Sequence, residues 1–311
     1  MSKCLFCYGP LEKNEDDFHV SCSRKMFSSS KPPILDFDAT QVEQMARKVV
    51  SRNITITGVQ PKLSLQLDKN SQLSRLTIVG VFGDYILKPA SPQFPELPQN
   101  EDLTMHLAKI VNIKTAKHSL IRLKSGDLAY LTKRFDRGKE GKIAVEDFCQ
   151  LSENLTEHKY RGSIEKIGKL VHKYTTNTGY EVQRLFELVL FCFLVGNADM
   201  HLKNFALIEN QWGEFELSPA FDLLNTAIAI PEDHEETALT INGKKRKIKR
   251  SDFDTLSNNL IINEKAKQAI YLRFYDVYGQ WVQQIEKSFL SHDVKKQYKT
   301  FIKEKFSTLY R

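Results

Sequence analysis

Cysteine is scarce in this chain, with five residues among 311. An odd and small number of cysteines argues against the disulfide framework of a secreted domain and leaves reduced thiols or a metal site. Cys149 and Cys192 stand among apolar neighbours, the ordinary setting of a buried thiol that packs as a small hydrophobic residue. The remaining cysteines, Cys4, Cys7 and Cys22, all lie near the N-terminus.

Long hydrophobic segments are also missing. The longest apolar run, residues 185–195, is too short to span a bilayer and contains Glu187. The first residues lack the apolar core of a signal peptide, and no low-complexity stretch points to extensive disorder. We therefore expect a folded cytoplasmic protein that has no membrane partner.

The composition is that of an ordinary globular protein, with 41% hydrophobic and 27% charged residues. Its formal net charge of +7 favours polyanionic partners such as ATP, tRNA or DNA, although charge alone does not choose among them. A chain of 311 residues suits one large domain or two closely packed lobes.

The apolar pattern divides the chain into three parts. Residues 1–35 are expected to form a small Cys/His appendage and a linker, because they end in a stretch rich in serine and proline. Residues 36–135 favour a β-rich N-lobe, and residues 136–311 favour a mainly helical C-lobe. This order predicts a two-lobed α+β fold.

Alternation and helical periodicity predict the individual elements. Strands are expected over residues 54–58, 63–67, 76–79, 84–88 and 128–132. Hairpins are expected from residues 206–208 with 215–217, and from residues 238–241 with a basic return strand after the Asn242-Gly243 turn. Helices are expected over residues 38–50, 100–111, 164–174 and 181–195, and again from the second hairpin to the C-terminus.

Residues 196–204, Gly-Asn-Ala-Asp-Met-His-Leu-Lys-Asn, carry the most chemical information. Phosphoryl transfer requires a carboxylate that orients the attacking hydroxyl and, five residues later, an amide oxygen that helps to hold Mg²⁺. Asp199 and Asn204 have this spacing. The same spacing also arises by chance, so a helix-capping Asp and a turn Asn remain the alternative.

Asp222 supports the first interpretation because it follows the second strand of the predicted hairpin. A carboxylate at that place can bind Mg²⁺ across the β- and γ-phosphates of ATP. Lys203 lies between the two pieces. It is interpreted either as a group that neutralises the migrating phosphoryl charge or as a solvated lysine.

The first lobe supplies candidates for phosphate binding. Lys88 ends a predicted strand, and Glu101 on the next helix is its expected partner, although a helix-surface Glu is the common alternative. Gly58, with Lys62 four residues later, is typical of a turn that covers phosphate, but a plain β-hairpin explains a single glycine equally well.

Five segments in this order, residues 57–62, 86–89, 133–137, 197–204 and 219–224, resemble those of the HipA-like toxin kinases. The resemblance covers roughly residues 40–311, and Asn-x-Asp-x-His-x-Lys-Asn is its most specific motif. It implies a two-lobed protein-kinase-like fold and dependence on ATP and Mg²⁺. It further implies the short, HipT-like form, because a strand-rich N-terminal subdomain of the longer members has no counterpart before residue 40.

The resemblance also implies roles for individual residues. Asp199 would be the catalytic aspartate with Lys203 beside it, while Asn204 and Asp222 would bind Mg²⁺. Lys88 would bind phosphate, and residues 133–135 would form the hinge that contacts adenine. The full set implied at the nucleotide is Thr57, Gly58, Val59, Gln60, Lys62, Lys88, Glu101, Lys133, Arg134, Phe135 and His201. Thr55 and Thr57 would be the autophosphorylation candidates, where relatives more often have serine.

The implied activity is that of a protein serine/threonine kinase, the toxin of a toxin–antitoxin system, with an aminoacyl-tRNA synthetase as a candidate substrate. Its implied partners are a small antitoxin resembling the missing subdomain and a helix-turn-helix protein through which any DNA contact would run. A small-molecule phosphotransferase of the same fold and a non-catalytic pseudokinase scaffold in a DNA-binding complex are the alternatives. The presence of the catalytic residue types argues against the second.

Two further patterns stand outside this resemblance. Cys4, Cys7, His19 and Cys22 have spacings compatible with a small knuckle-like or treble-clef Zn²⁺ site, although ordinary packing in an appendage explains them as well. Residues 244–250 carry six positive charges in seven positions. They are interpreted as a solvated arm, balanced by the acidic residues 231–237, or as a contact for a phosphate-rich partner.

Overall fold

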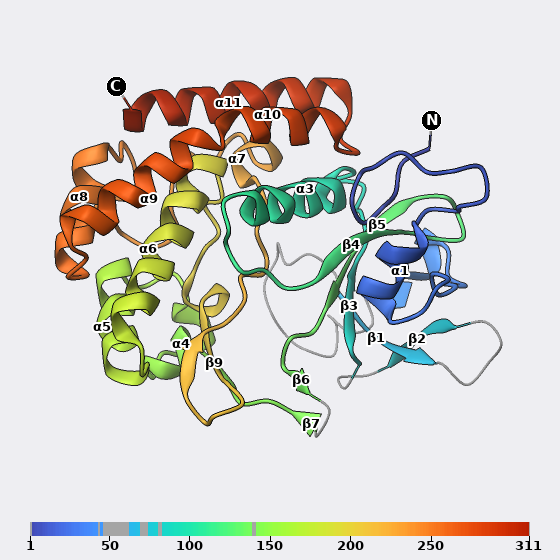
Figure 1. The fold of residues 1–311 in the computed structure, drawn as a ribbon, viewed down its shortest axis with the longest axis horizontal. Coiled ribbons are helices and arrows are strands. Elements are labelled where there is room, and N and C mark those ends of the chain that lie inside the picture. The colour runs from blue at the N-terminus through green and yellow to red at the C-terminus, as the bar shows by residue number, and fades with distance from the viewer. Residues whose placement is uncertain are drawn as a thin grey trace. The chain divides into compact units, whose positions relative to one another are not determined.

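The computed structural model describes residues 2–42, 44–45, 62–68, 74–79, 83–138 and 141–310. The chain forms two compact units (Figure 1). Unit 1 comprises Met1–Asp102, Ala116–Phe135 and Lys287–Phe289, and unit 2 comprises Leu103–Thr115, Asp136–Glu286 and Leu290–Arg311. The first part of helix α3 (Leu97–Ile110) therefore belongs to unit 1 and the rest to unit 2.

Unit 1 is built on a five-stranded sheet of order β2-β1-β3-β5-β4, in which every pair of neighbours is antiparallel. Its strands are β1 (Leu63–Asp68), β2 (Arg75–Val79), β3 (Tyr85–Lys88), β4 (His118–Arg122) and β5 (Leu128–Lys133). Apolar residues alternate in β1, where Leu63, Leu65 and Leu67 are buried, because successive side chains of a strand point to opposite faces.

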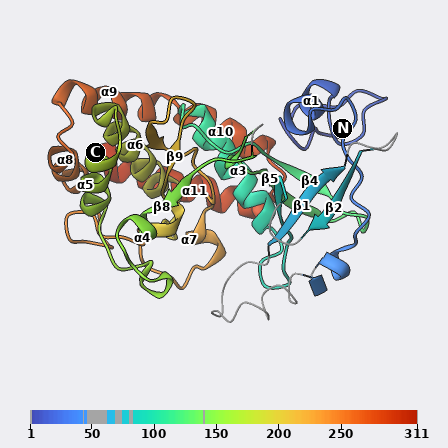
Figure 2. The same ribbon diagram turned by 90° about the horizontal axis from the view of Figure 1, so that it is seen from below.

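Residues 1–35 share one hydrophobic core with this sheet. Helix α1 (Val20–Phe27) buries Met26 and Phe27 in the same cluster as Leu65 and Leu87. Figure 2 shows α1 and the N-terminal segment on one side of the strands. The N-terminal segment is thus a layer of unit 1, whereas the sequence predicted an appendage and a linker.

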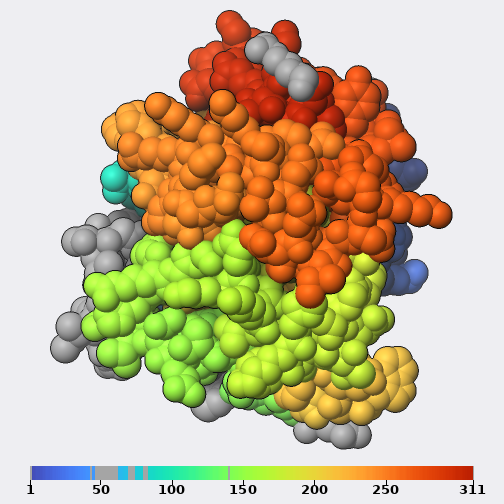
Figure 3. All heavy atoms as spheres, turned by 90° about the vertical axis from the view of Figure 1, so that its left-hand side faces the viewer, coloured from blue at the N-terminus to red at the C-terminus, as the bar shows by residue number. Residues whose placement is uncertain are grey.

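Unit 2 is mainly helical (Figure 1). Its helices are α4 (Phe148–Leu151), α5 (Ile164–Tyr174), α6 (Thr178–Val195), α7 (Thr226–Ala229), α8 (Arg250–Asn259), α9 (Glu264–Asp276), α10 (Tyr278–Lys287) and α11 (His292–Tyr310), with α10 ending in unit 1 at Lys287. Figure 3 shows one face of unit 2, where the orange α8 and α9 lie between the yellow-green α5 and α6 and the red α11. None of the helices in the described ranges combines the length and the apolar character that a bilayer crossing needs.

Helix α6 is the centre of unit 2. Residues 188–195 are buried without interruption, so the C-terminal half of the helix is apolar on all sides, as expected for a segment surrounded by other elements. Phe191 and Phe193 make edge-to-face contacts with Trp281 and Phe253 at centroid distances of 5.5 and 5.2 Å. This packing fixes the C-terminal end of α6, from which residues 196–204 emerge.

A small sheet of order β10-β9-β8 accompanies the helices, with β8 (Val145–Asp147), β9 (Ala206–Glu209) and β10 (Phe215–Leu217). The predicted hairpin of β9 and β10 is confirmed, and Leu217 lies opposite Leu207. A short ribbon, β6 (Arg137–Gly138) with β7 (Gly141–Lys142), lies at the start of the second segment of unit 2.

The second predicted hairpin is wrong as a strand pair. Asn242 and Gly243 do form a turn with positive φ angles of 50° and 73°, as a type I′ turn requires. Beyond the Ile241–Lys244 bridge, however, the basic segment forms no strand. Its backbone turns away, with Ile248 N–H donating to Glu236 Oε2 at 2.8 Å.

The other predicted elements fall mostly on observed ones. Strand β4 was not predicted from the sequence, and the predicted strand at residues 54–58 lies outside the described residues. The predicted helix at residues 38–50 is helical over 39–42 and 44–45, and its remainder also lies outside the described residues.

Candidate active site

Residues 196–204 begin with a glycine that the local geometry requires. Gly196 ends α6 in a left-handed conformation with φ of 76°, which residues with a Cβ adopt at a cost. A Cβ at this position would lie 2.6 Å from Phe301 Cε1. The glycine therefore allows the chain to leave α6 sharply beneath α11.

The start of α7 anchors the loop. Thr226 Oγ1 donates to Gly196 O at 3.0 Å and accepts the Ala198 N–H at 2.8 Å. Thr226 N–H also donates to Gly196 O, at 2.9 Å. One threonine thus fixes both sides of the turn that precedes Asp199.

Asp199 and Asn204 are joined directly. Asn204 Nδ2 donates to the Asp199 carbonyl at 2.8 Å, and Asp199 N–H donates to Asn197 Oδ1 at 3.3 Å. The Asp199 carboxylate accepts a hydrogen bond of 2.7 Å from the hydroxyl of Tyr160. Because the amide nitrogen of Asn204 is engaged within the loop, its Oδ1 is the atom that can serve as a ligand.

Tyr160 is a neighbour that sequence reasoning missed. It lies 39 residues before Asp199, and the two segments are joined by the Leu202 N–H, which donates to Lys159 O at 3.0 Å. The Tyr160 ring also meets the His201 ring edge-on at a centroid distance of 5.0 Å. No local motif marks Tyr160, since its role arises from a tertiary contact.

His201 is buried and neutral. Burial lowers the pKa of its imidazole to about 4, although the Asp199 carboxylate opposes the shift. Its Nδ1 makes no hydrogen bond within the described part of the chain. Any contact of His201 with a nucleotide at neutral pH would therefore involve an uncharged ring.

Lys203 is paired with a carboxylate that the sequence did not suggest. Its Nζ donates to Asp147 Oδ2 at 2.9 Å. Asp147 also caps α4, because its side chain accepts the Gln150 N–H at 2.9 Å. Lys203 is therefore paired with a carboxylate, while 36% of its side chain stays exposed.

Asp222 follows the β9–β10 hairpin, as predicted. Ser218 N–H donates to Ala206 O at 2.9 Å. Because the two strands are paired, the segment that carries Asn204 and the segment that leads to Asp222 lie at the same end of the hairpin. Asp222 has a left-handed backbone with φ of 58°. Such conformations in residues with a side chain are sparsely populated and concentrate at functional sites.

A buried carboxylate fixes β10. Glu181 Oε2 on α6 accepts the Leu217 N–H at 2.7 Å and Arg184 Nη1 at 2.8 Å. Burial raises the pKa of Glu181, while the Arg184 guanidinium and the Leu217 N–H act against this rise. The hairpin that leads to Asp222 is thereby attached to the central helix of unit 2.

These residues fit a magnesium ion in chemical type. Mg²⁺ prefers oxygen ligands and is commonly bound in proteins through one or two side chains together with phosphate oxygens. The amide oxygen of Asn204 and the carboxylate of Asp222 are ligands of this kind, and both flank the same end of the hairpin.

Unit 1 contains the second predicted group. Lys88 Nζ lies 2.7 Å from Glu101 Oε1, and their side chains are only 9% and 1% exposed. Burial raises the pKa of Glu101, and the Lys88 ammonium counteracts this rise. The structure therefore brings the two residues together as the sequence suggested.

Asp102 forms a second buried link in the next position of α3. Its Oδ1 accepts from His118 Nδ1 at 2.7 Å, and its Oδ2 accepts from the Tyr8 hydroxyl at 2.6 Å. Asp102 and His118 have fully buried side chains. The turn of α3 that carries Glu101 is thus connected both to β4 and to the N-terminal segment.

The predicted hinge is only partly available to a nucleotide. Lys133 N–H donates to Lys117 O at 2.7 Å, and Arg134 N–H donates to Asp84 O at 2.8 Å. These two donors are used inside unit 1, so neither can bind an adenine ring in this conformation. Phe135 is the last residue of this segment of unit 1.

The remaining nucleotide candidates lie at the edge of the described ranges. Lys62 is exposed directly before β1. Thr55, Thr57, Gly58, Val59 and Gln60 lie outside the described residues, and their predicted roles stay predictions.

The predicted metal ligands near the N-terminus do meet. The ligand atoms of Cys4, Cys7, His19 and Cys22 all lie within 4.8 Å of one another. All four belong to unit 1.

The basic segment 244–250 is partly engaged by acidic residues. Lys244 donates to Asp252 at 2.7 Å and Lys245 donates to Glu235 at 3.2 Å. Arg250 stacks on the Tyr271 ring at 3.3 Å. Part of this charge therefore stabilises unit 2, in keeping with the predicted balance by residues 231–237.

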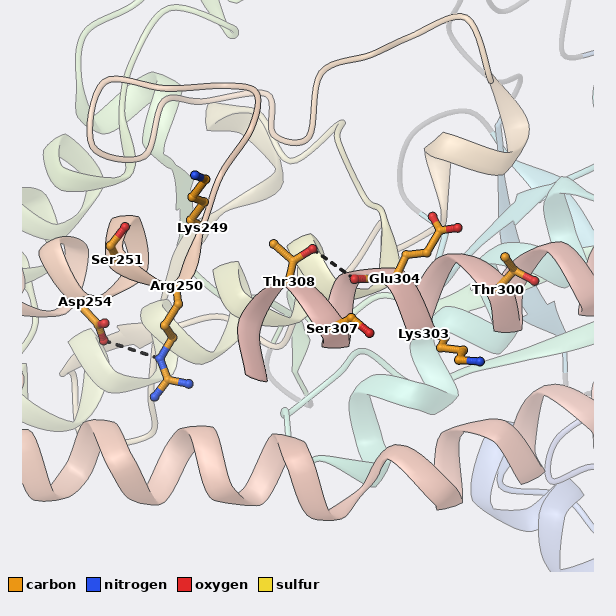
Figure 4. A pocket seen from close by; sticks show the side chains of 9 residues that line it. All are labelled: Lys249, Arg250, Ser251, Asp254, Thr300, Lys303, Glu304, Ser307 and Thr308. Atoms are coloured by element: carbon orange, nitrogen blue, oxygen red, sulfur yellow. Dashed lines mark hydrogen bonds and ion pairs between the residues drawn. The ribbon is translucent and has the colours of Figure 1, made fainter. Parts of the chain in front are cut away.

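An open groove of about 1090 Å³ lies between α8 and α11 (Figure 4). Its lining mixes both signs of charge with hydroxyl groups and consists of Lys249, Arg250, Ser251, Asp254, Thr300, Lys303, Glu304, Ser307 and Thr308. None of the predicted active-site residues that the structure describes lines it. The groove is therefore separate from the candidate chemistry.

Comparison with known proteins places the chain in a family. Residues 54–283, well over half of the chain, match the model of the HipA-like C-terminal domain. The chain belongs to this HipA-like family. The suspected resemblance is thereby confirmed.

Curated relatives of this HipA-like chain are named as kinases. "Putative kinase" of Haemophilus influenzae is 25% identical over 260 residues, which cover 78% of this chain and 73% of that protein. "Putative kinase Y4dM" of Sinorhizobium fredii is 33% identical over 205 residues, covering 62% of this chain and 49% of that protein. The chain thus spans about half the length of the Sinorhizobium relative.

Solved structures confirm the kinase-like α+β fold. HipA of Shewanella oneidensis, solved with HipB and operator DNA, has a TM-score of 0.68 at 20% identity, covering 84% of this chain and 70% of HipA. The proinflammatory kinase CtkA of Helicobacter pylori has a TM-score of 0.54 at 16% identity, covering 72% of this chain and 86% of CtkA. At these identities the likeness concerns the fold.

Proposed function

We propose that this HipA-like chain is an ATP-dependent protein serine/threonine kinase. The observation that carries the proposal is the 2.8 Å hydrogen bond from Asn204 Nδ2 to the Asp199 carbonyl. It fixes a carboxylate and an amide oxygen in one loop at the spacing that phosphoryl transfer uses. The names of the curated relatives support the same reaction class.

In this proposal, the Asp199 carboxylate orients the substrate hydroxyl and accepts its proton, while the Tyr160 hydroxyl holds that carboxylate in place. Asn204 and Asp222 bind Mg²⁺, which when present neutralises charge on the phosphates. Lys203 is positioned by Asp147 and supplies a positive charge beside the loop.

Lys88 is the proposed phosphate ligand of unit 1. Its ammonium is fixed by Glu101 at 2.7 Å, so it would bind an anionic group from a predetermined position instead of from a flexible surface stem. Thr55 and Thr57 are proposed as sites of self-modification.

We further propose a toxin role for this kinase, with an aminoacyl-tRNA synthetase as its target and inhibition of translation as the result. Support for a complex with a helix-turn-helix DNA-binding partner comes from the Shewanella HipA, which was solved with HipB and operator DNA. A separate small antitoxin protein would be a second partner, and this chain would contact DNA only through its partners.

The test combines the purified chain with labelled ATP, Mg²⁺ and a bacterial lysate, and follows label in proteins and in small molecules. Wild type should label proteins on Ser or Thr, while Asp199→Ala should not. Asp293→Ala is the matched control, because Asp293 is a carboxylate with 92% side-chain exposure on α11. Label confined to small molecules would indicate a small-molecule phosphotransferase, and no label in any fraction would indicate a pseudokinase scaffold.

A further inference from the structure

The N-terminal segment contains a tight turn that brings two thiols together. Cys4 N–H donates to Gly9 O at 2.8 Å, and Tyr8 N–H donates to Cys4 O at 2.9 Å. Tyr8 takes a left-handed conformation with φ of 64°. The turn therefore folds Cys7 back toward Cys4.

Gly9 of this turn packs directly against the cluster of thiols and His19. A Cβ on Gly9 would lie 3.3 Å from His19 Cε1 and 3.4 Å from Cys7 Sγ, so glycine leaves room for the cluster.

His19 presents one particular ring nitrogen to the thiols. Its Nε2 lies 2.9 Å from Pro10 O, and since a carbonyl only accepts, Nε2 carries the proton. The lone pair of Nδ1 then faces the sulfur atoms. Nδ1 is 3.3 Å from Cys7 Sγ and 3.6 Å from Cys22 Sγ. A histidine that donates one nitrogen to a carbonyl and offers the other to thiols is typical of a metal ligand.

These separations fit a tetrahedral ion. With Zn–S near 2.3 Å and Zn–N near 2.0 Å, the ligand atoms around zinc lie roughly 3.5 to 3.8 Å apart. The two observed sulfur–nitrogen distances lie close to that range, and all four ligand atoms lie within 4.8 Å of one another. We propose that Cys4, Cys7, His19 and Cys22 form a structural zinc site in unit 1.

The site has a structural purpose that follows from its surroundings. Helix α1 has only eight residues, too few to be stable alone in water. Helix α1 is held to the sheet where the Tyr85 hydroxyl donates to Met26 O at 3.1 Å. The turn before α1 is held to the sheet where Leu120 N–H donates to Leu5 O at 3.1 Å. A metal would join the turn that carries Cys4 and Cys7 to helix α1, which carries Cys22. The free energy of zinc binding would then also stabilise the folded N-terminal segment.

The same turn reaches the residue next to the ion pair of unit 1. Tyr8, between Cys7 and Gly9, donates to Asp102 at 2.6 Å, and Asp102 is the neighbour of Glu101. The zinc site would therefore support the turn of α3 that positions Glu101 against Lys88. An effect of the zinc site on activity rests on the proposed kinase function. The zinc site itself does not rest on that function.

The test measures metal content in the full chain purified without added metal. We expect about one zinc per chain in wild type and in Cys149→Ser, a control thiol in unit 2. Cys7→Ala and His19→Ala should retain little zinc, whereas His19→Cys should keep it, because four thiolates also bind zinc tetrahedrally. In the Co²⁺-loaded protein, the visible absorption should be that of tetrahedral thiolate coordination and should shift in His19→Cys.

Two results would overturn the proposal: folded wild type that contains no zinc, or stoichiometric zinc in folded Cys7→Ala and His19→Ala. Iron in place of zinc would overturn the choice of metal. If the alanine variants do not fold, two other results decide the question. His19→Cys should keep zinc, and the exposed Cys7 should be protected against alkylation until a chelator is added. None of these measurements depends on kinase activity, so the zinc site and the proposed function can fail separately.

Discussion

The loop of unit 2 and the ion pair of unit 1 are held in place differently. Asp199 and Asn204 are bonded within their own loop, and Thr226 joins this loop to the start of α7. Lys88 and Glu101 are both buried and depend on the packing of α3 against the sheet. A loop held by several local hydrogen bonds can lose one side chain without unfolding, whereas removing one partner of a buried ion pair is strongly destabilising.

The largest effect should follow from breaking the pair in unit 1. Lys88→Met leaves Glu101 buried without its cation, which typically costs about 3–5 kcal/mol in the free energy of unfolding. The double variant Lys88→Met, Glu101→Leu should recover most of that stability, because an apolar pair often replaces a buried ion pair at little loss.

Urea unfolding of the single and double variants measures this coupling, and phosphoryl transfer measures function. We expect the double variant to remain inactive although it is stable. If the stability losses of the two substitutions simply add, the two side chains are not coupled as the structure indicates.

In the loop, we expect a substitution to reduce activity strongly and stability only slightly. Asn204→Ala removes both the bond to the Asp199 carbonyl and the proposed Mg²⁺ ligand, so we expect transfer to fall by about 10²- to 10³-fold, the size typical of losing one transition-state contact. The midpoint of thermal unfolding should change little. Asn258→Ala, an exposed residue of α8, is the control; equal activity of the two variants would contradict the assignment.

Gly196 tests whether the start of the loop depends on its packing. Gly196→Ala must adopt a left-handed backbone and place its Cβ 2.6 Å from Phe301, so we expect a loss of about 2–3 kcal/mol in the free energy of unfolding. Gly279→Ala in α10 has no atom within 4 Å of its added Cβ, and should be neutral or slightly stabilising. Similar values for the two substitutions would show that the turn relaxes without strain.

The smallest effect concerns the basic segment and depends on pH. Burial alone would raise the pKa of Asp252, but hydrogen bonds from Lys244, Asn242 and the Lys249 N–H lower it. Because the folded pKa lies below the unfolded one, the unfolded chain binds more protons between the two values, and this contribution to stability is lost as the pH falls through them.

Asp252→Asn should therefore cost about 1 kcal/mol at neutral pH. The difference from wild type should shrink below about pH 4. Chemical denaturation at several pH values measures this difference, and a value that does not change with pH would show that the carboxylate charge has no part in holding the basic segment.

Local patterns in the sequence were sufficient for the loop and for most strands. The Asp199–Asn204 spacing, the β9–β10 hairpin and the alternation of β1 follow from neighbouring residues. Strand β4 was missed because its first four residues are all buried, which removes the alternation that marks a half-exposed strand. The return strand after Gly243 was wrongly expected because its basic residues pair with acidic side chains instead of with a second strand.

Tertiary contacts could not be predicted in the same way. Tyr160 and Asp147 meet the loop through chain segments 39 and 56 positions away. Tyr8 and Asp102 are separated by 94 positions, and neither belongs to a recognisable motif. The four Cys/His residues are an exception, because metal-ligand spacing is visible in the sequence even where the fold that joins them is not.

The central claim is that Asp199 serves the transfer of phosphate from ATP. Asp199→Asn keeps the size of the side chain and an oxygen that can accept from Tyr160, so the fold should be retained. The most direct measurement is single-turnover transfer of labelled phosphate to protein by wild type, Asp199→Asn and the exposed control Asp293→Asn at equal folded concentration. We expect the control to match wild type and Asp199→Asn to be slower by about 10²- to 10⁴-fold; equal rates in all three would contradict the claim.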